Sequence, residues 1–307
     1  MYYFLNLIAS VAKHFPKAVM GARIVKGLHR FPRLNCKFED IPYMFIYVSK
    51  AAIANGSNPV WAVMADKYAS REFVAKRIGE EHLIPLYGHW ENPEDIDFDS
   101  LKPPYILKTN NGCGTNIFVH EDTKVDRDEI IRTMKKALAF PYPELTGQLH
   151  YSMIKPCVIA EKLMTQGAGE RSLIDYKVQC VNGVPQRIIV ISDRGEGKGN
   201  NFSFKIMTFD TDWNPLPETV SEEYRDNPEH IKRPDNLEEM LEMASKLSVD
   251  EEFLRVDFYI IDGKIYFGEL TCTPDTAIAP VYVPEGMNAI LDKIKADRKA
   301  GKSKRPF

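Results

Sequence analysis

The sequence predicts a mixed α/β fold (α+β), in which short strands and helices alternate along one chain. Two runs near the C-terminus, Leu254–Ile260 and Lys264–Cys272, alternate apolar and polar residues with the two-residue period of a strand. A loop rich in glycine and asparagine separates two further strand-like runs, Tyr105–Lys108 and Ile117–Val119. After them, helical spacing places four apolar residues on one side of a helix: Ile130, Ile131, Met134 and Leu138.

Helices are predicted to dominate the chain before the first strand. Residues 1–60 show a helical pattern interrupted by turn signals at Phe31-Pro32 and Asn55–Pro59. A helix over Lys67–Ile78 and a short strand over Ile84–Tyr87 follow.

A surface connection is predicted over Glu91–Pro104, where acids and prolines cluster. Beyond the glycine-containing loop, strands are predicted over Cys157–Lys162, Tyr176–Val181 and Gln186–Ile191. A helix over Asn236–Leu247 then leads into the C-terminal strand pair.

Length and composition describe an ordinary globular protein. The 307 residues, with a mass of 35.1 kDa, are 44% hydrophobic and 27% charged, which allows a full core and two or three packed subdomains. The formal net charge is −3, but the first fifty residues and the run Lys293–Arg305 are basic. We expect these charges to form solvated faces; contact with anionic substrates or with a membrane surface is the alternative. No nucleic-acid-binding motif is present, so no nucleic-acid partner is predicted.

Cysteine usage and hydropathy predict a cytoplasmic protein. The five cysteines are widely spaced and form no CxxC pair, which is typical of a reducing compartment. No apolar stretch is long enough to span a bilayer, and the opening residues lack the basic start of a signal peptide. The apolar stretch up to Phe15 is expected to pack on the body of the protein, with peripheral contact at the inner membrane face as the alternative.

The C-terminal strand pair carries the residues of a metal and phosphate site. Arg255 and Asp257 leave the same face of their strand, roughly 7 Å apart, and Glu269 stands on the second strand. A hard divalent cation beside a phosphate needs this mixture of carboxylates and positive charge. A two-residue loop at Asp262-Gly263 would point the two carboxylates to opposite faces. We therefore predict a three-residue or bulged turn over Ile261–Gly263. Such a turn would set Arg255 opposite Glu269, with Asp257 as the diagonal neighbour.

The loop that follows Lys108 is suited to phosphate. Gly112 and Gly114 lie among small polar residues, including Asn111 and Thr115, so that backbone N–H groups can turn toward phosphate oxygens. Lys108 adds a positive charge from the preceding strand. The loop is not a Walker loop, which requires Gly-Lys-Ser/Thr before a helix, and no HRD or DFG sequence follows as in a protein kinase. Taken alone, the pattern also suits an ordinary hairpin loop.

The order of these motifs resembles the ATP-grasp superfamily. A strand that ends in lysine, a glycine loop, Glu161-Lys162-Leu163, Asp175-Tyr176-Lys177 and an Arg-x-Asp…Glu strand pair follow one another. More narrowly, the run from Asp66-Lys67 to Glu269-Leu270-Thr271 looks like the TupA-like ATP-grasp family, which is associated with bacterial surface-polysaccharide biosynthesis. Two further marks of the resemblance are Asn182-Gly183-Val184-Pro185 and Ser192-Asp193-Arg194.

The resemblance implies an ATP-grasp fold in which a small glycine-loop lid subdomain covers residues 105–162. A larger nucleotide and metal subdomain would cover residues 163–290. Residues 1–104 would form an abbreviated N-terminal portion, helical and ending in the surface connection, because the strand–GxGxxG–helix start of a complete Rossmann-like domain is missing. Residues 291–307 would form a basic C-terminal tail.

The resemblance also implies that the cofactors are ATP and Mg²⁺. Lys67 and Lys108 would contact the ATP phosphates, and Glu161 would form the adenine hinge with the backbone around Leu163. Asp175 matches the acidic position that meets the ribose. The implied nucleotide-binding set is Lys67, Lys108, Asn111, Gly112, Gly114, Thr115, Glu161, Leu163, Asp175 and Lys177.

Metal ligation and catalysis are implied for the C-terminal strand pair. Asp257 and Glu269 would hold magnesium between the β- and γ-phosphates, and Arg255 would neutralise the transferred phosphoryl group. Thr271 departs from the family, because many ATP-grasp enzymes have asparagine there. A hydroxyl ligates magnesium less firmly, so one or two metals stay open. The catalytic candidates are Arg255, Lys108 and Arg194.

Substrate contacts are expected around a second glycine-rich loop. The candidates there are Asp193, Arg194, Lys198 and Lys205. Arg194 would clamp a carboxylate and Asp193 would orient an amine. A hairpin loop with an incidental ion pair is the alternative.

The family context implies an ADP-forming carboxylate–amine ligase. Such enzymes phosphorylate a carboxylate to an acyl phosphate, which an amine then attacks. The expected substrates are a uronic acid, as a nucleotide sugar or a glycan, and an amino acid or small amino alcohol. The expected wider partners are the membrane surface or the machinery of polysaccharide assembly.

Two other functions stay open. A glycosyltransferase would use Asp210-Thr211-Asp212 as its metal site, although a turn before Trp213 is the favoured interpretation of this triplet. A nucleotide-binding protein without turnover is the other, and Thr271 supports it. Neither Cys113 nor Cys272 is expected to act as a nucleophile, and the histidines lack the spacing of metal ligands.

Overall fold

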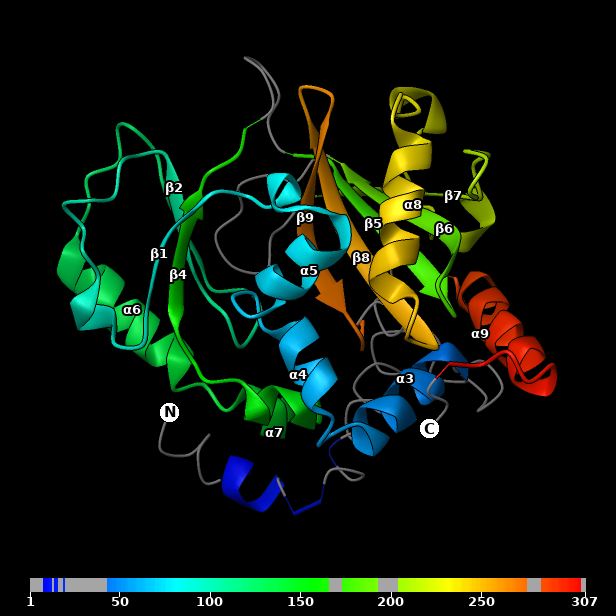
Figure 1. Ribbon diagram of the computed structural model, residues 1–307, viewed down its shortest axis with the longest axis horizontal. Helices are drawn as coiled ribbons and strands as arrows, with labels where there is room; N and C mark the ends of the chain where they lie inside the picture. Colours follow the sequence, from blue (N-terminus) through cyan, green and yellow to red (C-terminus); the bar gives the residue numbers. More distant parts are fainter. Residues whose placement is uncertain are drawn as a thin grey trace.

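The chain forms two antiparallel sheets with helices packed between and around them, which confirms the mixed α/β prediction. The computed structural model describes residues 8–12, 14–15, 19, 43–165, 173–192, 204–274 and 283–304. Figure 1 shows the smaller sheet on the left and the larger sheet on the right. Helices α4 (Pro59–Ala65) and α5 (Ser70–Ile78) lie between the two.

The smaller sheet has four strands in the order β1-β4-β2-β3. Their bounds are β1 Leu86–Trp90, β2 Tyr105–Thr109, β3 Asn116–Val119 and β4 Val158–Lys162. Helix α6 (Arg127–Leu138) begins at Asp126, whose side chain accepts a hydrogen bond from Glu129 N at 2.9 Å. Its buried side chains Ile130 and Met134 pack on one face of this sheet, against Leu107 and others. The buried residues of β2 and the apolar side of α6 therefore form one small core.

The larger sheet has five strands in the order β7-β6-β5-β8-β9. Their bounds are β5 Asp175–Val181, β6 Val184–Ser192, β7 Lys205–Phe209, β8 Phe253–Ile261 and β9 Lys264–Thr271. Helices α5 and α8 (Leu237–Ser248) cover one face, on which Val178, Val256 and Phe258 are fully buried. Because side chains alternate along a strand, Lys177, Arg255 and Asp257 leave the opposite face.

The turn between β8 and β9 differs from the prediction. Asp262 and Gly263, with φ angles of 51° and 74°, form a two-residue turn, and Ile261 pairs with Lys264. The three-residue loop is therefore wrong. The register changes instead inside β9, where Gly268 is the extra residue of a β-bulge.

The bulge turns Glu269 toward the side of Asp257. Phe267 and Leu270 both pack in the core, so the residue before Leu270 leaves the opposite face. Asp257 is the direct cross-strand partner of Glu269, which corrects the predicted pairing of Glu269 with Arg255. Arg255 pairs with Thr271 instead.

Helices α3 (Tyr43–Ala54) and α9 (Pro284–Lys299) pack together on the large sheet. They contact each other, and both cover the end of the sheet near Phe253. The segment expected to be a basic tail is therefore helical up to Lys299, because Ile290, Leu291 and Ile294 give it an apolar face that the sheet buries. Most of the basic N-terminal segment lies outside the described residues.

Several element boundaries moved by a few residues, and some short elements were not expected. The helix predicted from Lys67 begins at Ser70, and the strand predicted from Ile84 begins at Leu86. Strand β7 and the short helix α7 (Tyr142–Thr146) had no prediction. The proposed subdomain boundaries stay a prediction, and strand β1 joins the small sheet from within the segment before residue 105. Within the described ranges, every helix is too short or too polar to cross a membrane.

Candidate functional site

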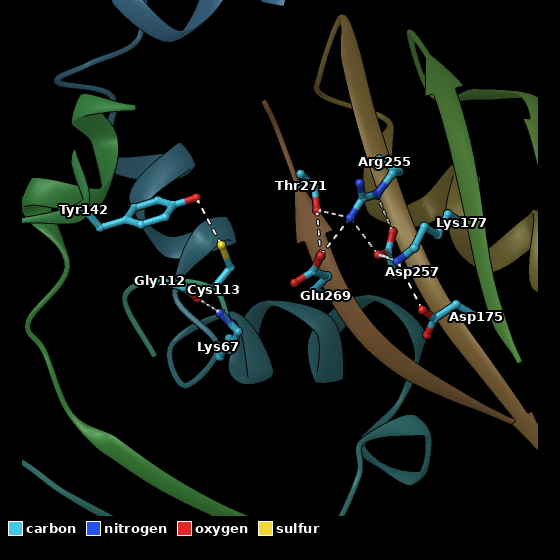
Figure 2. Close-up of polar contacts among 10 residues, drawn as sticks. All are labelled: Lys67, Gly112, Cys113, Tyr142, Asp175, Lys177, Arg255, Asp257, Glu269 and Thr271. Atoms are coloured by element: carbon cyan, nitrogen blue, oxygen red, sulfur yellow. Dashed lines mark hydrogen bonds and ion pairs between the residues drawn. The ribbon is translucent and has the colours of Figure 1, made fainter. Parts of the chain in front are cut away.

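Asp257 lies at the centre of a cluster of charged side chains on the face of the large sheet opposite helices α5 and α8 (Figure 2). Its carboxylate is buried, and Arg255 donates to it twice, from Nε to Oδ1 at 2.7 Å and from Nη2 to Oδ2 at 2.8 Å. Lys177 Nζ also donates to Oδ2 of Asp257 and lies 3.7 Å from Asp175 Oδ2. The prediction that Arg255 and Asp257 share a face is confirmed.

Glu269 and Thr271 complete the cluster from strand β9. Arg255 Nη2 donates to Glu269 Oε1 at 2.7 Å and to Thr271 Oγ1 at 3.0 Å. The Thr271 hydroxyl in turn donates to Glu269 Oε1 at 3.2 Å. One guanidinium group therefore holds the two predicted metal-binding carboxylates and the hydroxyl in a single arrangement (Figure 2).

The two carboxylates have opposite electrostatic surroundings. Burial raises the pKa of Asp257 above its ordinary value, although Arg255 and Lys177 oppose the rise. Burial would also raise the pKa of Glu269. There, however, the charges of Arg255, Lys177 and Lys67 outweigh burial and lower the pKa to about 2. Glu269 is thus the carboxylate that keeps its charge most firmly, as a ligand for a divalent cation must.

Glu269 faces the glycine loop. Its side chain keeps 40% of its surface accessible. Lys67 and Tyr151 are also half-buried. Burial lowers the pKa of Lys67 and raises that of Tyr151, and the charge of Glu269 raises the pKa of both. Figure 2 shows Lys67 and Glu269 on the two sides of the space between the glycine loop and strand β9, which we call the cleft.

The glycine loop approaches this cleft from the small sheet. Lys67 Nζ donates a hydrogen bond to the carbonyl oxygen of Gly112 (Figure 2). Gly114 has a φ of +83°, a left-handed conformation that glycine adopts without strain. The loop therefore stands across from the carboxylates of the large sheet, as a phosphate-binding loop would.

Asp66 and Asn110 anchor the loop, and sequence reasoning did not select either residue as functional. Asp66 Oδ1 accepts hydrogen bonds from the backbone N–H groups of Tyr68 and Ala69, at 2.8 and 3.1 Å, which closes the turn between α4 and α5. The same oxygen accepts from Asn110 Nδ2 at 2.9 Å, and Asn110 Oδ1 accepts from Cys157 N at 2.7 Å. The acid directly before Lys67 was the signal available in the sequence.

Glu161 lies in a separate group of charges near the end of β4, an inner strand of the small sheet. Lys108 Nζ is 2.5 Å from Glu161 Oε2, and Arg71 Nη1 is 3.0 Å from Glu161 Oε1. Arg71 also donates to the carbonyl oxygen of Ile84 at 2.8 Å, which ties helix α5 to the chain that enters β1. Leu163 follows the strand, and its N–H donates to Pro104 O at 3.2 Å. Lys108, Glu161 and Leu163 are thus close together, as an adenine hinge would require.

The remaining predicted residues are divided between the two sides of the cleft and positions away from it. Asn111 is buried in the glycine loop, and Thr115 is half-buried there. Lys205 is on strand β7, which forms the edge of the large sheet opposite β9. Its Nζ donates to the carbonyl oxygen of Glu223 at 3.3 Å. The candidates Asp193, Arg194 and Lys198 lie outside the described residues.

The donor set at β8 and β9 fits magnesium. Mg²⁺ prefers hard oxygen ligands and is commonly bound by one or two carboxylates, with substrate phosphates and water completing its shell. Asp257 and Glu269 stand directly opposite each other, and Thr271 adds a hydroxyl beside them. No set of three or more acidic, histidine or cysteine side chains arranged for a metal occurs in the described part of the chain. Two carboxylates and a hydroxyl leave places in the shell of such an ion for phosphate oxygens and water.

Two further motifs have structural roles. Asp210 Oδ1 accepts hydrogen bonds from the N–H groups of Asp212 and Asn214, at 3.0 and 2.7 Å, which confirms the predicted turn before Trp213. Cys272 is buried in the core as predicted, and burial raises its pKa well above the ordinary value. Cys113 is an exposed loop residue.

We expect the protein to lose stability as the pH falls from about 6.5 toward 4. Burial lowers the pKa of His150 from 6.5 to about 4, and its Nδ1 is without a hydrogen-bond partner among the described atoms. The folded state keeps the imidazole neutral, whereas the unfolded chain takes up a proton below the ordinary pKa. This stabilisation is therefore complete above pH 6.5 and declines by up to about 3 kcal/mol at pH 4.

Urea unfolding at neutral pH and at about pH 4.5 would measure this loss. The His150→Phe variant, which keeps an aromatic ring beside Trp61, should lose much less stability between the two conditions. Equal losses in the variant and the wild type would show that other groups cause the pH dependence.

Three solved structures illustrate what the chain resembles. It is similar to D-alanine–D-alanine ligase from Bacillus anthracis complexed with ATP, with 18% identity and a TM-score of 0.45, covering 78% of this chain and 67% of that chain. It is similar to L-amino acid ligase from Bacillus licheniformis, with 16% identity and a TM-score of 0.48, covering 91% of this chain and 61% of that chain. The third is the ATP-grasp ligase PsnB complexed with a phosphomimetic variant of its minimal precursor, Mg and ADP, with 16% identity, a TM-score of 0.42, and 81% and 61% coverage.

The family assignment comes from the sequence itself. No curated protein gives a significant match. The family described as TupA-like ATPgrasp matches residues 49–292, which include both sheets, the glycine loop and the carboxylates of β8 and β9. The chain therefore belongs to the TupA-like ATP-grasp family.

Proposed function

We propose that this protein is an ATP- and magnesium-dependent carboxylate–amine ligase that forms ADP and acts through an acyl phosphate. Its substrates would be a uronic acid, as a nucleotide sugar or a glycan, and an amino acid or small amino alcohol. The reaction would serve surface-polysaccharide assembly in the cytoplasm, with peripheral contact at the inner membrane face. Family membership supports the reaction class, and the substrate class follows from the family context.

One observation carries the proposal: the cross-strand pair of Asp257 and Glu269, with Arg255 bridging both, faces Lys67 and the glycine loop across a cleft. Negative charges for a metal and positive charges for phosphate are thereby brought together from two sheets. Magnesium, when bound, would neutralise charge on the β- and γ-phosphates. Asp257 and Glu269 would hold it.

The side chains around the pair would position the reactants. Lys67 would turn from the Gly112 carbonyl to the phosphates, and Lys108 would contact the phosphates from strand β2. Arg255 would lie beside the γ-phosphoryl group, where five fixed N–H donors suit a planar arrangement of oxygens. Glu161, held between Arg71 and Lys108, would accept a hydrogen bond from the amino group of adenine.

The reaction would proceed in two steps. A carboxylate oxygen of the substrate attacks the γ-phosphorus, the bond to the bridging oxygen of ATP breaks, and ADP leaves. The neutral amine then attacks the acyl carbon, phosphate leaves, and the amine gives up a proton. No group of the protein forms a covalent bond in either step, so the protein acts by positioning and by stabilising charge.

Incubating the purified protein with ATP, Mg²⁺, UDP-glucuronic acid and a panel of amines tests the proposal directly. ADP, phosphate and an amide are expected in equal amounts. Hydroxylamine provides a second arm, because it attacks an acyl phosphate to give a hydroxamate whatever the natural amine is. UDP release without ATP consumption would favour glycosyl transfer, and ATP binding without turnover would favour a nucleotide-binding protein.

The glycosyltransferase alternative receives no support from its proposed metal triplet. The Asp210 carboxylate already accepts hydrogen bonds from Asp212 N, Asn214 N and Asn214 Nδ2. It therefore closes a turn between strand β7 and the residues after it.

A further inference from the structure

The phenol of Tyr142 contacts the glycine loop from the side opposite Lys67. Cys113 Sγ donates to Tyr142 Oη at 3.6 Å, and Figure 2 shows the Tyr142 hydroxyl directed at this thiol. The ring also closes over the backbone, since a Cβ atom at Gly112 would lie 3.9 Å from it. Lys67 holds the carbonyl of the same Gly112. The loop is thus held between a cation on one side and a phenol on the other.

Tyr142 is itself connected to the large sheet through a buried hydrogen-bonded chain. Gln148 Nε2 donates to Tyr142 Oη at 3.2 Å, and Thr273 Oγ1 donates to Gln148 Oε1 at 2.6 Å. Gln148 and Thr273 are both 4% exposed. Thr273 lies two residues beyond Thr271, at the end of strand β9 that carries the predicted metal ligands. A continuous polar path therefore joins the metal-bearing strand to the glycine loop.

The elements at the two ends of this path are far apart in the sequence. The glycine loop belongs to the small sheet and Thr273 follows the large one, so their relative position needs a tertiary connection. The ring of Tyr142 is fixed in orientation by Tyr151, with centroids 5.0 Å apart and planes at 62°. A fixed phenol oxygen that accepts from both sides can set how far the loop stands from the cleft.

We infer that Tyr142 is a positioning residue for the glycine loop and that Gln148 couples it to Thr273. Through Cys113, Tyr142 holds the loop at the distance from Glu269 and Thr271 at which its backbone N–H groups meet the phosphates of ATP. This inference rests on the proposed function, in that the loop is taken to cover ATP. Tyr142 acts through the loop and not on the reacting atoms.

Three variants separate this role from simple packing. Tyr142→Phe removes the acceptor oxygen and keeps the ring. Thr273→Val cuts the far end of the path with little change in shape, and Thr273→Ser restores the hydroxyl. Tyr87→Phe is the matched control, because Tyr87 is 41% exposed on strand β1. Thermal unfolding of all four variants separates a local change at the loop from a general loss of stability.

Alkylation of Cys113 by iodoacetamide reports the state of the loop without any turnover. Cys113 is exposed, whereas Cys157, Cys180 and Cys272 are buried and have raised pKa values. Cys36, which lies outside the described residues, is replaced by serine in every protein compared. Without nucleotide, Tyr142→Phe and Thr273→Val should react about three- to tenfold faster than wild type, the size expected from one lost hydrogen bond. Thr273→Ser and Tyr87→Phe should match wild type.

Steady-state kinetics provide the second readout. In Tyr142→Phe, the KM for ATP should rise about three- to tenfold with kcat changed less than about twofold, because the loop contacts are made before the chemical step. Unchanged alkylation in Tyr142→Phe, or faster alkylation with an unchanged KM for ATP, would overturn the inference. Failure of the ligase proposal looks different: Mg²⁺ with a non-hydrolysable ATP analogue would then give the wild type no protection of Cys113, and no hydroxamate would form.

Discussion

Glu269→Gln is expected to lower magnesium-dependent turnover by on the order of a thousandfold or more, because loss of a ligand charge removes several kcal/mol of transition-state stabilisation. Glu269 is the carboxylate that three cations hold ionised, and it is the more accessible of the pair. Glutamine keeps the size and one acceptor oxygen but cannot neutralise a divalent cation. Asp257→Asn should have a similar effect on turnover, because Asp257 stands directly opposite.

Both variants are expected to remain folded. Arg255 keeps its contacts with Asp257 when Glu269 is replaced. Asp257→Asn should cost more stability, about 3–5 kcal/mol, because the buried Arg255 and Lys177 lose a shared counter-charge. Glu269 and Asp175 stay close to these two cations. Thermal unfolding followed by circular dichroism would show whether the fold survives.

ADP formation at increasing Mg²⁺ concentrations measures the effect on turnover. The matched control is Glu242→Gln, because Glu242 is an exposed acid on helix α8 that pairs only one helical turn away, with Lys246 at 2.7 Å. This control should keep wild-type activity. If Glu269→Gln and Asp257→Asn both keep full activity, the metal assignment is wrong.

Local patterns predicted most of the elements that build the site. The alternation along β8 placed Leu254, Val256 and Phe258 in the core and Arg255 with Asp257 on the other face. The glycine loop and its flanking strands were also visible in the sequence. Such features depend on neighbours two to four residues apart, so the sequence carries them directly.

The connections between the two sheets could not be predicted in the same way. Asn110 bonds Asp66, Arg71 bonds Glu161, and Thr273 bonds Gln148 across 125 residues of sequence. Each contact depends on how the two sheets and the helices between them pack. The pattern of residues within a single segment therefore does not predict it. The apolar face of α9 was missed for another reason, because its lysines and arginines dominated the composition.

The bulge at Gly268 leaves a signal in the sequence, in the spacing of the core residues of β9. Ile265 and Phe267 are two residues apart, but the next core residue, Leu270, follows after three. A break of this kind in a two-residue period indicates an extra residue in the strand. The extra residue that brings Glu269 to the side of Asp257 is therefore Gly268, inside β9. The turn itself needs only two residues, Asp262 and Gly263.

Gly268→Val is expected to destabilise the protein by about 1–3 kcal/mol and to lower turnover about a hundredfold, because overpacking at the bulge shifts the backbone. A Cβ atom at this position would lie 3.1 Å from the Asp257 carbonyl oxygen and 3.1 Å from Tyr259 Cε2. The carbonyl belongs to the residue that faces Glu269, so the strain would fall on the metal site itself. Denaturant unfolding and ADP formation would measure the two effects separately.

Deletion and insertion at the same place distinguish the bulge from a general need for glycine. Deleting Gly268 removes only the extra residue, so Phe267 still faces the core, Glu269 still faces Asp257, and the protein should fold with partial activity. Inserting an alanine after Gly268 would exchange the faces of the sheet for the residues on one side of the insertion. Either Glu269 would be buried or Phe267 would be exposed, so turnover should be lost. If the insertion were tolerated and the deletion were not, the bulge would not be what brings the two carboxylates together.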